Sequence, residues 1–209
     1  MADAKPSCRL YLQLPAPLTA KLEAQLAQAL ASTTAACVLL CDYGRPDDDA
    51  NTDRVIDLVQ AAGIACLIDN DIALAERLGA DGVHLEADPA LYRGAREQLG
   101  ESASIGAGCG LSRHAAMALA EAGADYVAFG PDAGDIDGID QCAELIAWWS
   151  EIFIVPCVAW NVDDAGQAAH LARLGADFVA PSRTIWQDDR AATIIAGIDN
   201  AIRSVRRAA

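Results

Sequence analysis

Short runs of hydrophobic residues alternate along the chain with longer segments in which hydrophobic residues recur at helical spacing. The short runs indicate buried strands, and the longer segments indicate helices with one buried face. The predicted strands are residues 9–14, 37–41, 64–68, 82–85, 103–107, 126–129, 153–159 and 178–180. The predicted helices are residues 18–30, 53–62, 70–78, 89–99, 112–122, 139–150, 163–174 and about 189–206. The chain is therefore built from eight strand–helix units.

Three of the joints between a helix and the next strand repeat the tripeptide Gly-Ala-Asp, at 79–81, 123–125 and 175–177. The glycine supplies the left-handed residue that closes a helix, and repeated helix-to-strand joints are typical of parallel sheets. Eight such units favour a closed barrel. We therefore predict the α/β class and a single (β/α)8 TIM barrel domain over residues 1–209. A doubly wound open sheet is the alternative, because periodicity alone does not show closure.

Composition adds expectations about the environment and partners of the protein. The seven cysteines form no Cys-x-x-Cys pair, which favours a reducing compartment and predicts a cytoplasmic protein. We find neither a signal peptide nor an apolar run of membrane-spanning length. The net charge of −15 disfavours binding to nucleic acid or anionic membranes. It also opposes anionic substrates unless a metal ion or nearby cations reverse the local field.

Ligands of β/α barrels bind at the carboxyl ends of the strands, and two sequence blocks at these ends resemble a known family. The first block comprises Leu-Ile-Asp-Asn-Asp at 67–71 and Leu-Gly-Ala-Asp-Gly-Val-His-Leu at 78–85. The second is Gly-Ala-Asp-Tyr-Val-Ala-Phe-Gly-Pro at 123–131. In order and spacing these blocks resemble thiamine phosphate synthases, and the resemblance covers most of the chain.

The resemblance implies an enzyme that joins an aminopyrimidine diphosphate to a thiazole phosphate and releases pyrophosphate, with Mg²⁺ holding the leaving group. It implies Asp71 and Asp88 as metal ligands. The substrate-binding residues that we expect at the strand ends are Arg45, Asn70, His84, Gly106, Gly130, Trp160, Ser182 and Arg183. The implied partner is a small phosphorylated ligand.

Several positions depart from the family pattern, which marks the chain as a divergent member. Ile72 stands where the family has an arginine, and Trp160 with Asn161 replaces a glycine pair, so the indole would fill space for the thiazole phosphate. The loop at 132–138 is acidic and lacks the family's lysine and threonines. Arg45 could at best replace a family cation after the second strand. Each lost cationic contact to phosphate removes about 1.5–3 kcal/mol, so we expect weak or absent synthase activity.

Some of these residues also have purely structural interpretations. Asp71 and Asp88 are placed to cap helices, and His84 to pack inside the barrel. Three hypotheses for function stay open: an active synthase, a divergent barrel with another small ligand or altered catalysis, and a non-catalytic regulatory protein. The Trp148–Trp149 pair on a predicted helix suggests a homodimer.

Overall fold

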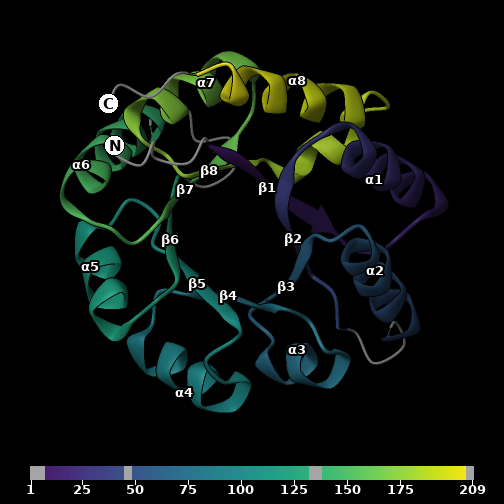
Figure 1. Cartoon of the computed structure of the whole chain (residues 1–209), viewed down its shortest axis with the longest axis horizontal. Coiled ribbons are helices and arrows are strands. Elements are labelled where there is room, and N and C mark those ends of the chain that lie inside the picture. Colours follow the sequence, from purple (N-terminus) through teal and green to yellow (C-terminus); the bar gives the residue numbers. More distant parts are fainter. Residues whose placement is uncertain (1–7, 45–48, 132–137, 206–209) are drawn as a thin grey trace, which may run out of the picture.

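The computed structural model describes residues 8–44, 49–131 and 138–205, and it confirms the predicted TIM barrel. The eight strands pair in parallel, in chain order, and the last pairs with the first (Figure 1). They are β1 (Arg9–Pro15), β2 (Ala35–Cys41), β3 (Ala65–Asp69), β4 (Gly82–Glu86), β5 (Ser104–Gly108), β6 (Tyr126–Phe129), β7 (Cys157–Val162) and β8 (Phe178–Pro181). Closure of the sheet excludes the open doubly wound alternative.

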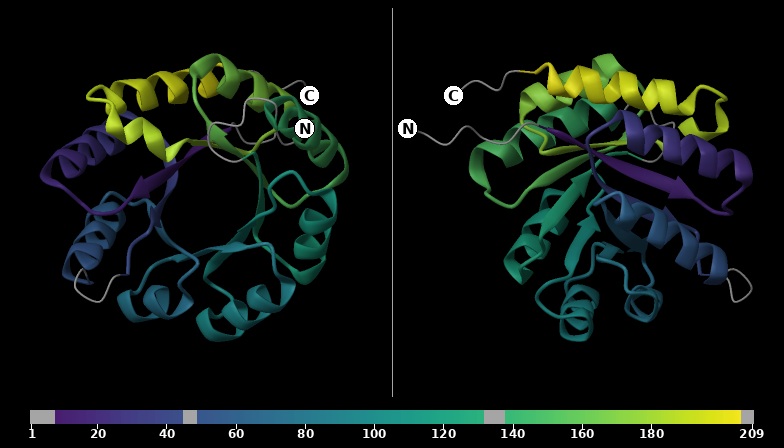
Figure 2. Two further views of the ribbon diagram at one scale, coloured as in Figure 1. Left: turned by 180° about the vertical axis from the view of Figure 1, so that it is seen from behind. Right: turned by 45° about the vertical axis from the view of Figure 1, so that its right-hand side comes forward.

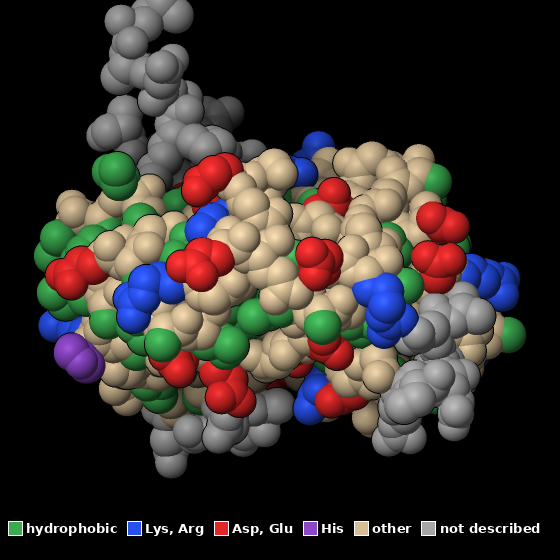
Figure 3. Space-filling view, turned by 90° about the horizontal axis from the view of Figure 1, so that it is seen from below, with side chains coloured by type: hydrophobic (Ala, Val, Ile, Leu, Met, Phe, Trp, Pro, Cys, Tyr) green, Lys and Arg blue, Asp and Glu red, His purple; other side chains and the backbone are tan. Residues whose placement is uncertain are grey.

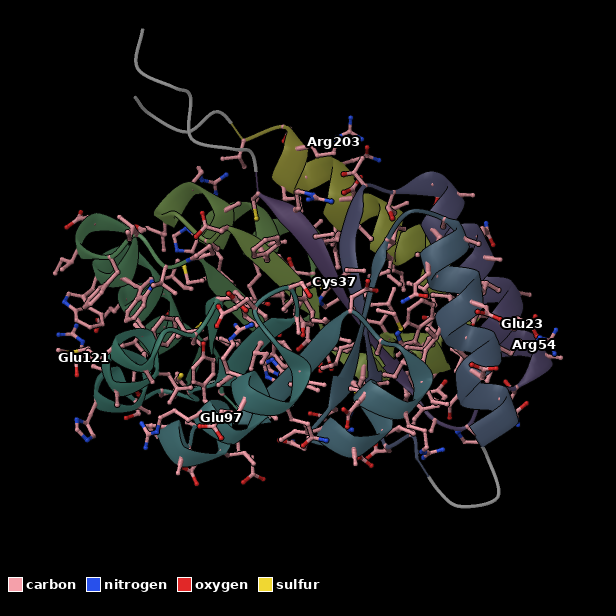
Figure 4. All side chains as sticks on the ribbon, turned by 60° about the horizontal axis from the view of Figure 1, so that its bottom comes forward. Glu23, Cys37, Arg54, Glu97, Glu121 and Arg203 are labelled. Atoms are coloured by element: carbon pink, nitrogen blue, oxygen red, sulfur yellow. The ribbon has the colours of Figure 1, made fainter. Side chains whose placement is uncertain are left out.

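The helices form a ring outside the barrel and cover its outer face (Figures 1 and 2). They are α1 (Ala20–Ser32), α2 (Asp49–Ala61), α3 (Ile72–Leu78), α4 (Pro89–Leu99), α5 (Arg113–Ala122), α6 (Gly138–Ile152), α7 (Ala165–Leu174) and α8 (Ala191–Arg203). Neighbouring helices also make surface ion pairs. Figure 4 shows Glu23 of α1 beside Arg54 of α2, whose carboxylate and guanidinium groups are 2.6 Å apart.

Several predicted boundaries are displaced, among them the start of α2 at Asp49 rather than at residue 53, and two of the differences have a visible cause. The seventh strand begins at Cys157 rather than at residue 153, because α6 continues to Ile152 and the Phe153 ring stacks on Trp149 at 3.9 Å. The apolar run that suggested a strand is therefore used to pack the end of a helix. A short 3₁₀ helix, η1 (Arg183–Gln187), which the sequence does not predict, follows β8 and delays the start of α8 to Ala191.

The repeated Gly-Ala-Asp joints have a common structure. Each glycine ends its helix in the left-handed conformation, with φ of 64° at Gly79, 100° at Gly123 and 113° at Gly175. Each aspartate then bonds twice to one residue of the preceding strand. Asp125 donates its backbone N–H to the Ile105 carbonyl at 3.0 Å, and its carboxylate accepts the Ile105 N–H at 2.7 Å. The joint thus fixes the bottom of each strand against its neighbour.

Inward-facing side chains fill the barrel in layers of four, each layer drawn from alternate strands. We assign the layers from the strand register and the alternation of side chains. The lower two are Cys37, Gly82, Tyr126 and Phe178, then Tyr11, Leu67, Gly106 and Val158. The next is Leu39, His84, Ala128 and Ala180, and the uppermost complete one is Gln13, Asp69, Gly108 and Trp160. Polar side chains are thus concentrated at the carboxyl ends of the strands.

Candidate functional site

A cavity of about 520 Å³ opens at the carboxyl ends of the strands. Its lining includes Gln13, Asp69, Glu86, Gly108, Trp160 and Arg183. A second cavity of about 260 Å³ lies at the opposite end of the barrel, around Tyr11, Cys37 and Phe178; Figure 4 shows Cys37 among the strands. We take the first, named here the mouth cavity, as the candidate site, because β/α barrels bind their ligands at this end.

The floor of the mouth cavity is an aromatic cluster inside the barrel. His84 is 5% exposed, and its Nδ1 lies 3.0 Å from the Tyr126 hydroxyl. That hydroxyl lies 2.8 Å from the hydroxyl of Tyr11. The Trp160 indole stacks on the His84 ring at 4.6 Å with 7° between the planes. Burial lowers the pKa of His84 to about 3, so the imidazole is neutral at physiological pH.

One wall of the cavity is acidic. Asp69 ends β3 and accepts a hydrogen bond from Asn70 Nδ2 at 3.0 Å. Burial, with the negative charges of Asp42 and Glu86, raises the pKa of Asp69 to about 6, while the Arg183 cation acts in the opposite direction. Arg183 itself pairs with Asp42 at 2.8 Å. Within the described ranges, the cavity therefore presents carboxylates together with one cation, Arg183, and that cation already has an anionic partner.

Asn70 shapes the junction between β3 and α3. Its backbone has φ of 52°, in the left-handed region that asparagine tolerates better than most residues. Its side-chain oxygen accepts the backbone N–H of Glu86 at 2.8 Å, which ties the ends of β3 and β4 together. Asn70 lines the mouth cavity, but its amide is also part of the structure around it.

Asp71 and Asp88, the two predicted metal ligands, both cap helices. Asp71 Oδ1 accepts the N–H of Leu74 at 2.8 Å at the start of α3. Asp88 Oδ1 accepts the N–H of Ala90 at 2.7 Å at the start of α4, with Pro89 as the first helical residue. Each cap uses one carboxylate oxygen. Among the described residues there is no group of three His, Cys, Asp or Glu side chains suited to holding a metal ion.

Gly106 and Gly130 are required by close packing of aromatic residues. A methyl group added at Gly106 would lie 2.2 Å from Cζ of Tyr126. At Gly130 it would lie 2.6 Å from the carbonyl oxygen and 2.7 Å from Cβ of Trp160. Gly106 therefore makes room for the Tyr126 ring and Gly130 for the backbone and Cβ of Trp160, which is a structural reason for both glycines that does not involve a ligand.

The ends of β7 and β8 are tied together by side-chain amides. Gln13 Nε2 donates to Asn161 Oδ1 at 3.3 Å and to the Pro181 carbonyl at 3.1 Å. Asn161 has φ of 58°, and its Nδ2 donates to the Pro131 carbonyl at 3.0 Å. Ser182 is buried and caps η1 through Thr184, with 3.4 Å between its Oγ and the Thr184 N–H. These bonds fix the backbone that carries Trp160.

The predicted cations are not brought together in the described residues. Arg183 reaches the mouth cavity, whereas Arg45 and the acidic residues 132–137 lie outside the part of the chain that the structure describes. Arg113 starts near a strand end, but its guanidinium lies over the Trp148 ring at 4.6 Å. Arg183 is thus the described arginine that lines the candidate site.

Four of the ten predicted site residues line the mouth cavity in the described part of the chain, namely Asn70, His84, Trp160 and Arg183. Gly106 and Gly130 do not line it and pack against Tyr126 and Trp160. Asp69, Glu86 and Gln13 also line it, although they are not among the residues predicted from the sequence. The alternation within each strand could have identified them: Asp69 is two residues from the inward-facing Leu67, and Glu86 is two residues from His84.

Comparison with known proteins gives a consistent assignment. Residues 11–185 match the family described as thiamine monophosphate synthase. A thiamine-phosphate synthase from Erythrobacter litoralis is 37% identical over 205 residues, covering 93% of this chain and 95% of that protein. One from Rhodospirillum centenum is 38% identical, covering 86% and 89%.

A solved structure shares the fold. The thiamine phosphate pyrophosphorylase from Pyrococcus furiosus has a TM-score of 0.78 at 18% identity, covering 93% of this chain and 95% of that one. At this identity the likeness concerns the fold alone, whereas the matched residues and the bacterial relatives concern the sequence itself. The chain belongs to the thiamine monophosphate synthase family.

Proposed function

We propose that this protein joins an aminopyrimidine diphosphate to a thiazole phosphate and releases pyrophosphate, with both substrates bound in the mouth cavity. The observation that supports this most is the position of the family-like residues. Asn70 lines the mouth cavity, and Asp71 and Asp88 cap the helices that follow β3 and β4, the strands whose ends form one wall of that cavity. A divergent barrel with a different ligand is the less favoured alternative, because the named relatives match nearly the full chain.

Mg²⁺ is the metal that we propose for this reaction. Mg²⁺ commonly binds through one or two carboxylates, with substrate phosphates and water completing its shell. Asp71 and Asp88 fit that pattern, because each uses one oxygen as a helix cap and carries a second. They would hold the ion together with the diphosphate. Bound there, Mg²⁺ would supply positive charge to the leaving pyrophosphate.

The chain's own residues would orient the substrates. Arg183 would contact phosphate oxygens once it exchanges its partner Asp42 for the ligand. Ser182 would contribute its hydroxyl, and the neutral His84 would close the floor of the cavity against water. Since Asp69 and Glu86 oppose anions here, we expect weak phosphate binding and slow turnover at low Mg²⁺.

The test is turnover of both substrates by the purified protein, measured as pyrophosphate release across a Mg²⁺ titration. We expect Asp71→Asn and Asp88→Asn to keep the helix caps and to lower activity at least about tenfold, partly restored by excess Mg²⁺. Asp140→Asn, an exposed aspartate in the first turn of α6, is the matched control and should leave turnover unchanged. No product from the wild-type protein at saturating Mg²⁺ would overturn the proposal.

We also propose the cellular compartment, the domain organisation and the classes of partner of the protein. The chain would act in the cytoplasm as one domain over residues 1–209, with small phosphorylated ligands and without nucleic acid or membrane partners. Its seven cysteines all lie in the described part of the chain, are buried and form no disulfide, which agrees with a reducing compartment. Among the described residues no helix is long and apolar enough to cross a membrane.

A homodimer is the proposed assembly. Trp149 is fully buried and donates to the Val155 carbonyl at 2.7 Å, so only its neighbour Trp148 reaches the surface. Close by, Ile152 and Ile154 are 62% and 99% exposed. Analytical ultracentrifugation of Ile154→Asp against the wild type tests whether these side chains support a dimer.

A further inference from the structure

Three rings inside the barrel form a column that ends at the mouth cavity. Trp160 and His84 are nearly parallel at 4.6 Å, and His84 and Tyr126 lie 5.8 Å apart with 21° between their planes. Their layers order them along the barrel axis, with Tyr126 lowest, His84 above it and Trp160 uppermost. The indole is half-buried and lines the cavity, so the column ends in a ring that a ligand can reach.

The position of the indole is fixed from several sides. The hydrogen bonds between His84 and Tyr126 and between Tyr126 and Tyr11 hold the rings below the indole in place. The Tyr11 ring meets the indole edge-on at 5.3 Å. Behind it, Gly130 leaves the space that Cβ of Trp160 occupies. A preorganised aromatic surface of this kind binds a planar ring with little loss of side-chain entropy.

A carboxylate lines the same cavity on the opposite side of the barrel. Asp69 and Trp160 belong to the same layer, on β3 and β7, which lie on opposite sides of an eight-stranded barrel. Gly108, between them on β5, contributes no side chain to the layer and leaves the cavity open there. The Asn70 amide donates to Asp69 Oδ1 at 3.0 Å and thereby orients the carboxylate.

We propose that Trp160 and Asp69 together recognise an amino-substituted, planar heteroaromatic ring. The ring stacks on the indole, and its exocyclic amino group donates a hydrogen bond to the Asp69 carboxylate. This inference rests on the proposed function, since it assigns the aminopyrimidine half of that reaction to the mouth cavity. A ring without a donor fits less well, because it would displace water from the partly buried carboxylate without supplying a hydrogen bond in its place.

The test uses two phosphate-free probes without Mg²⁺: 4-amino-2-methylpyrimidine, and 2,4-dimethylpyrimidine, in which a methyl group replaces the amino group. Proton NMR titrations give the Kd of each probe and the upfield shift of the 2-methyl resonance that stacking on an indole produces. For the wild type we expect the amino probe to bind about tenfold more tightly, the lower end of what a hydrogen bond to a charged group provides.

Substitution of Trp160 and of Asp69 should separate the contributions of the two side chains to probe binding. Trp160→Leu should weaken the binding of both probes about three- to tenfold and abolish the upfield shift. Trp160→Phe should retain both the binding and the upfield shift. Asp69→Ala should remove the preference for the amino probe but retain the shift. Trp148→Leu and Asp140→Ala change the same residue types on α6 and should leave both Kd values as in the wild type. Thermal melting confirms that each variant is folded.

Failure of this inference and failure of the proposed function are distinguishable. Equal binding of the two probes by the wild type, or unchanged binding by folded Trp160→Leu, overturns the inference even if the enzyme turns over both substrates. Absence of turnover together with the expected probe pattern overturns the proposed function and supports an amino-heteroaromatic site in a protein with other chemistry.

Discussion

His84 is buried inside the barrel in its neutral form. Because burial disfavours its protonated form, His84 makes the stability of the folded protein depend on pH. In the unfolded chain a histidine takes up a proton near pH 6.5, whereas in the folded protein burial lowers the pKa of His84 to about 3. Between these two values the unfolded state binds the extra proton. Stability contributed by His84 is therefore complete above pH 6.5 and is lost as the pH falls toward 3.

We expect the wild-type free energy of unfolding to fall by about 2 kcal/mol from this group alone between pH 7 and pH 5. His84→Gln, which cannot titrate, should show a smaller fall over the same range. Urea denaturation at both pH values gives the two differences, with exposed His170→Gln as the control that behaves like the wild type. Parallel pH dependence of the wild type and His84→Gln would contradict this account of His84.

Gly106 is a position where a single added methyl group should be strongly destabilising. In Gly106→Ala the new atom would meet the Tyr126 ring, whose Cζ lies 2.2 Å away, and overpacking of this kind costs about 1–3 kcal/mol. Gly197 on α8 is the matched control, because nothing lies within 4 Å of a methyl group there. Gly197→Ala should stabilise the helix by about 0.5–1 kcal/mol. Thermal melts that rank the two variants in the opposite order would show that the Tyr126 ring is free to move.

Neighbouring strands are held in register by the aspartates of the Gly-Ala-Asp joints. Asp81, Asp125 and Asp177 accept the backbone N–H of Cys66, Ile105 and Cys157 at 2.7, 2.7 and 2.9 Å. The same three aspartates donate their own N–H groups to the carbonyls of those residues. A repeated tripeptide thus corresponds to a repeated strand connection.

Replacing any of these three aspartates by alanine should cost about 1–2 kcal/mol, since each loses a charge-assisted bond to a strand N–H. Asp189→Ala serves as the control, because Asp189 is 91% exposed and its ion pair with Lys21 is worth about 0.5 kcal/mol or less. Denaturant titrations measure all four. Equal effects of Asp125→Ala and Asp189→Ala would mean that the joint contributes no more than a surface ion pair.

Element positions were predictable from the sequence where one periodicity dominates, as in α4 and α5, whose first residues differ from the prediction by at most one. They were not predictable where an apolar run packs against the end of a helix, as at Phe153. Nor were they predictable where a short 3₁₀ helix is stabilised by tertiary contacts, as in η1. Trp186 of η1 donates to the Gln13 carbonyl at 2.6 Å, a contact between residues far apart in the sequence.

The whole molecule carries a net charge of −15. Figure 3 shows acidic side chains spread over one side of the protein rather than gathered in a single patch. Such a surface repels itself most strongly in the folded state, because folding brings the charges together. Ions at about 0.5 M reduce the range of this repulsion to a few ångströms.

We therefore expect the Tm to rise when NaCl is increased from about 10 mM to about 0.5 M, because screening of the net charge outweighs loss of the surface ion pairs. The pairs among the described residues are mostly exposed, such as Lys21–Asp189 and Arg190–Asp188, whose cationic members are 54% and 77% exposed. Differential scanning calorimetry at the two salt concentrations measures the shift. A lower Tm in high salt would mean that the ion pairs, rather than net repulsion, govern the electrostatics.

The sequence alone determined the order of strands and helices, the parallel sheet and the family resemblance, because hydrophobic periodicity, helix-ending glycines and contiguous motifs are local properties of the chain. Eight strand–helix units favoured a closed barrel, but only the structure showed that the sheet closes. Only the tertiary structure decided that Trp160 stacks on His84 and that Asp69 shares its layer. Likewise, only the fold shows that Gly106 makes room for the Tyr126 ring and Gly130 for the backbone and Cβ of Trp160. These relations depend on which strands face each other when the sheet closes, and closure joins residues that are far apart in the sequence.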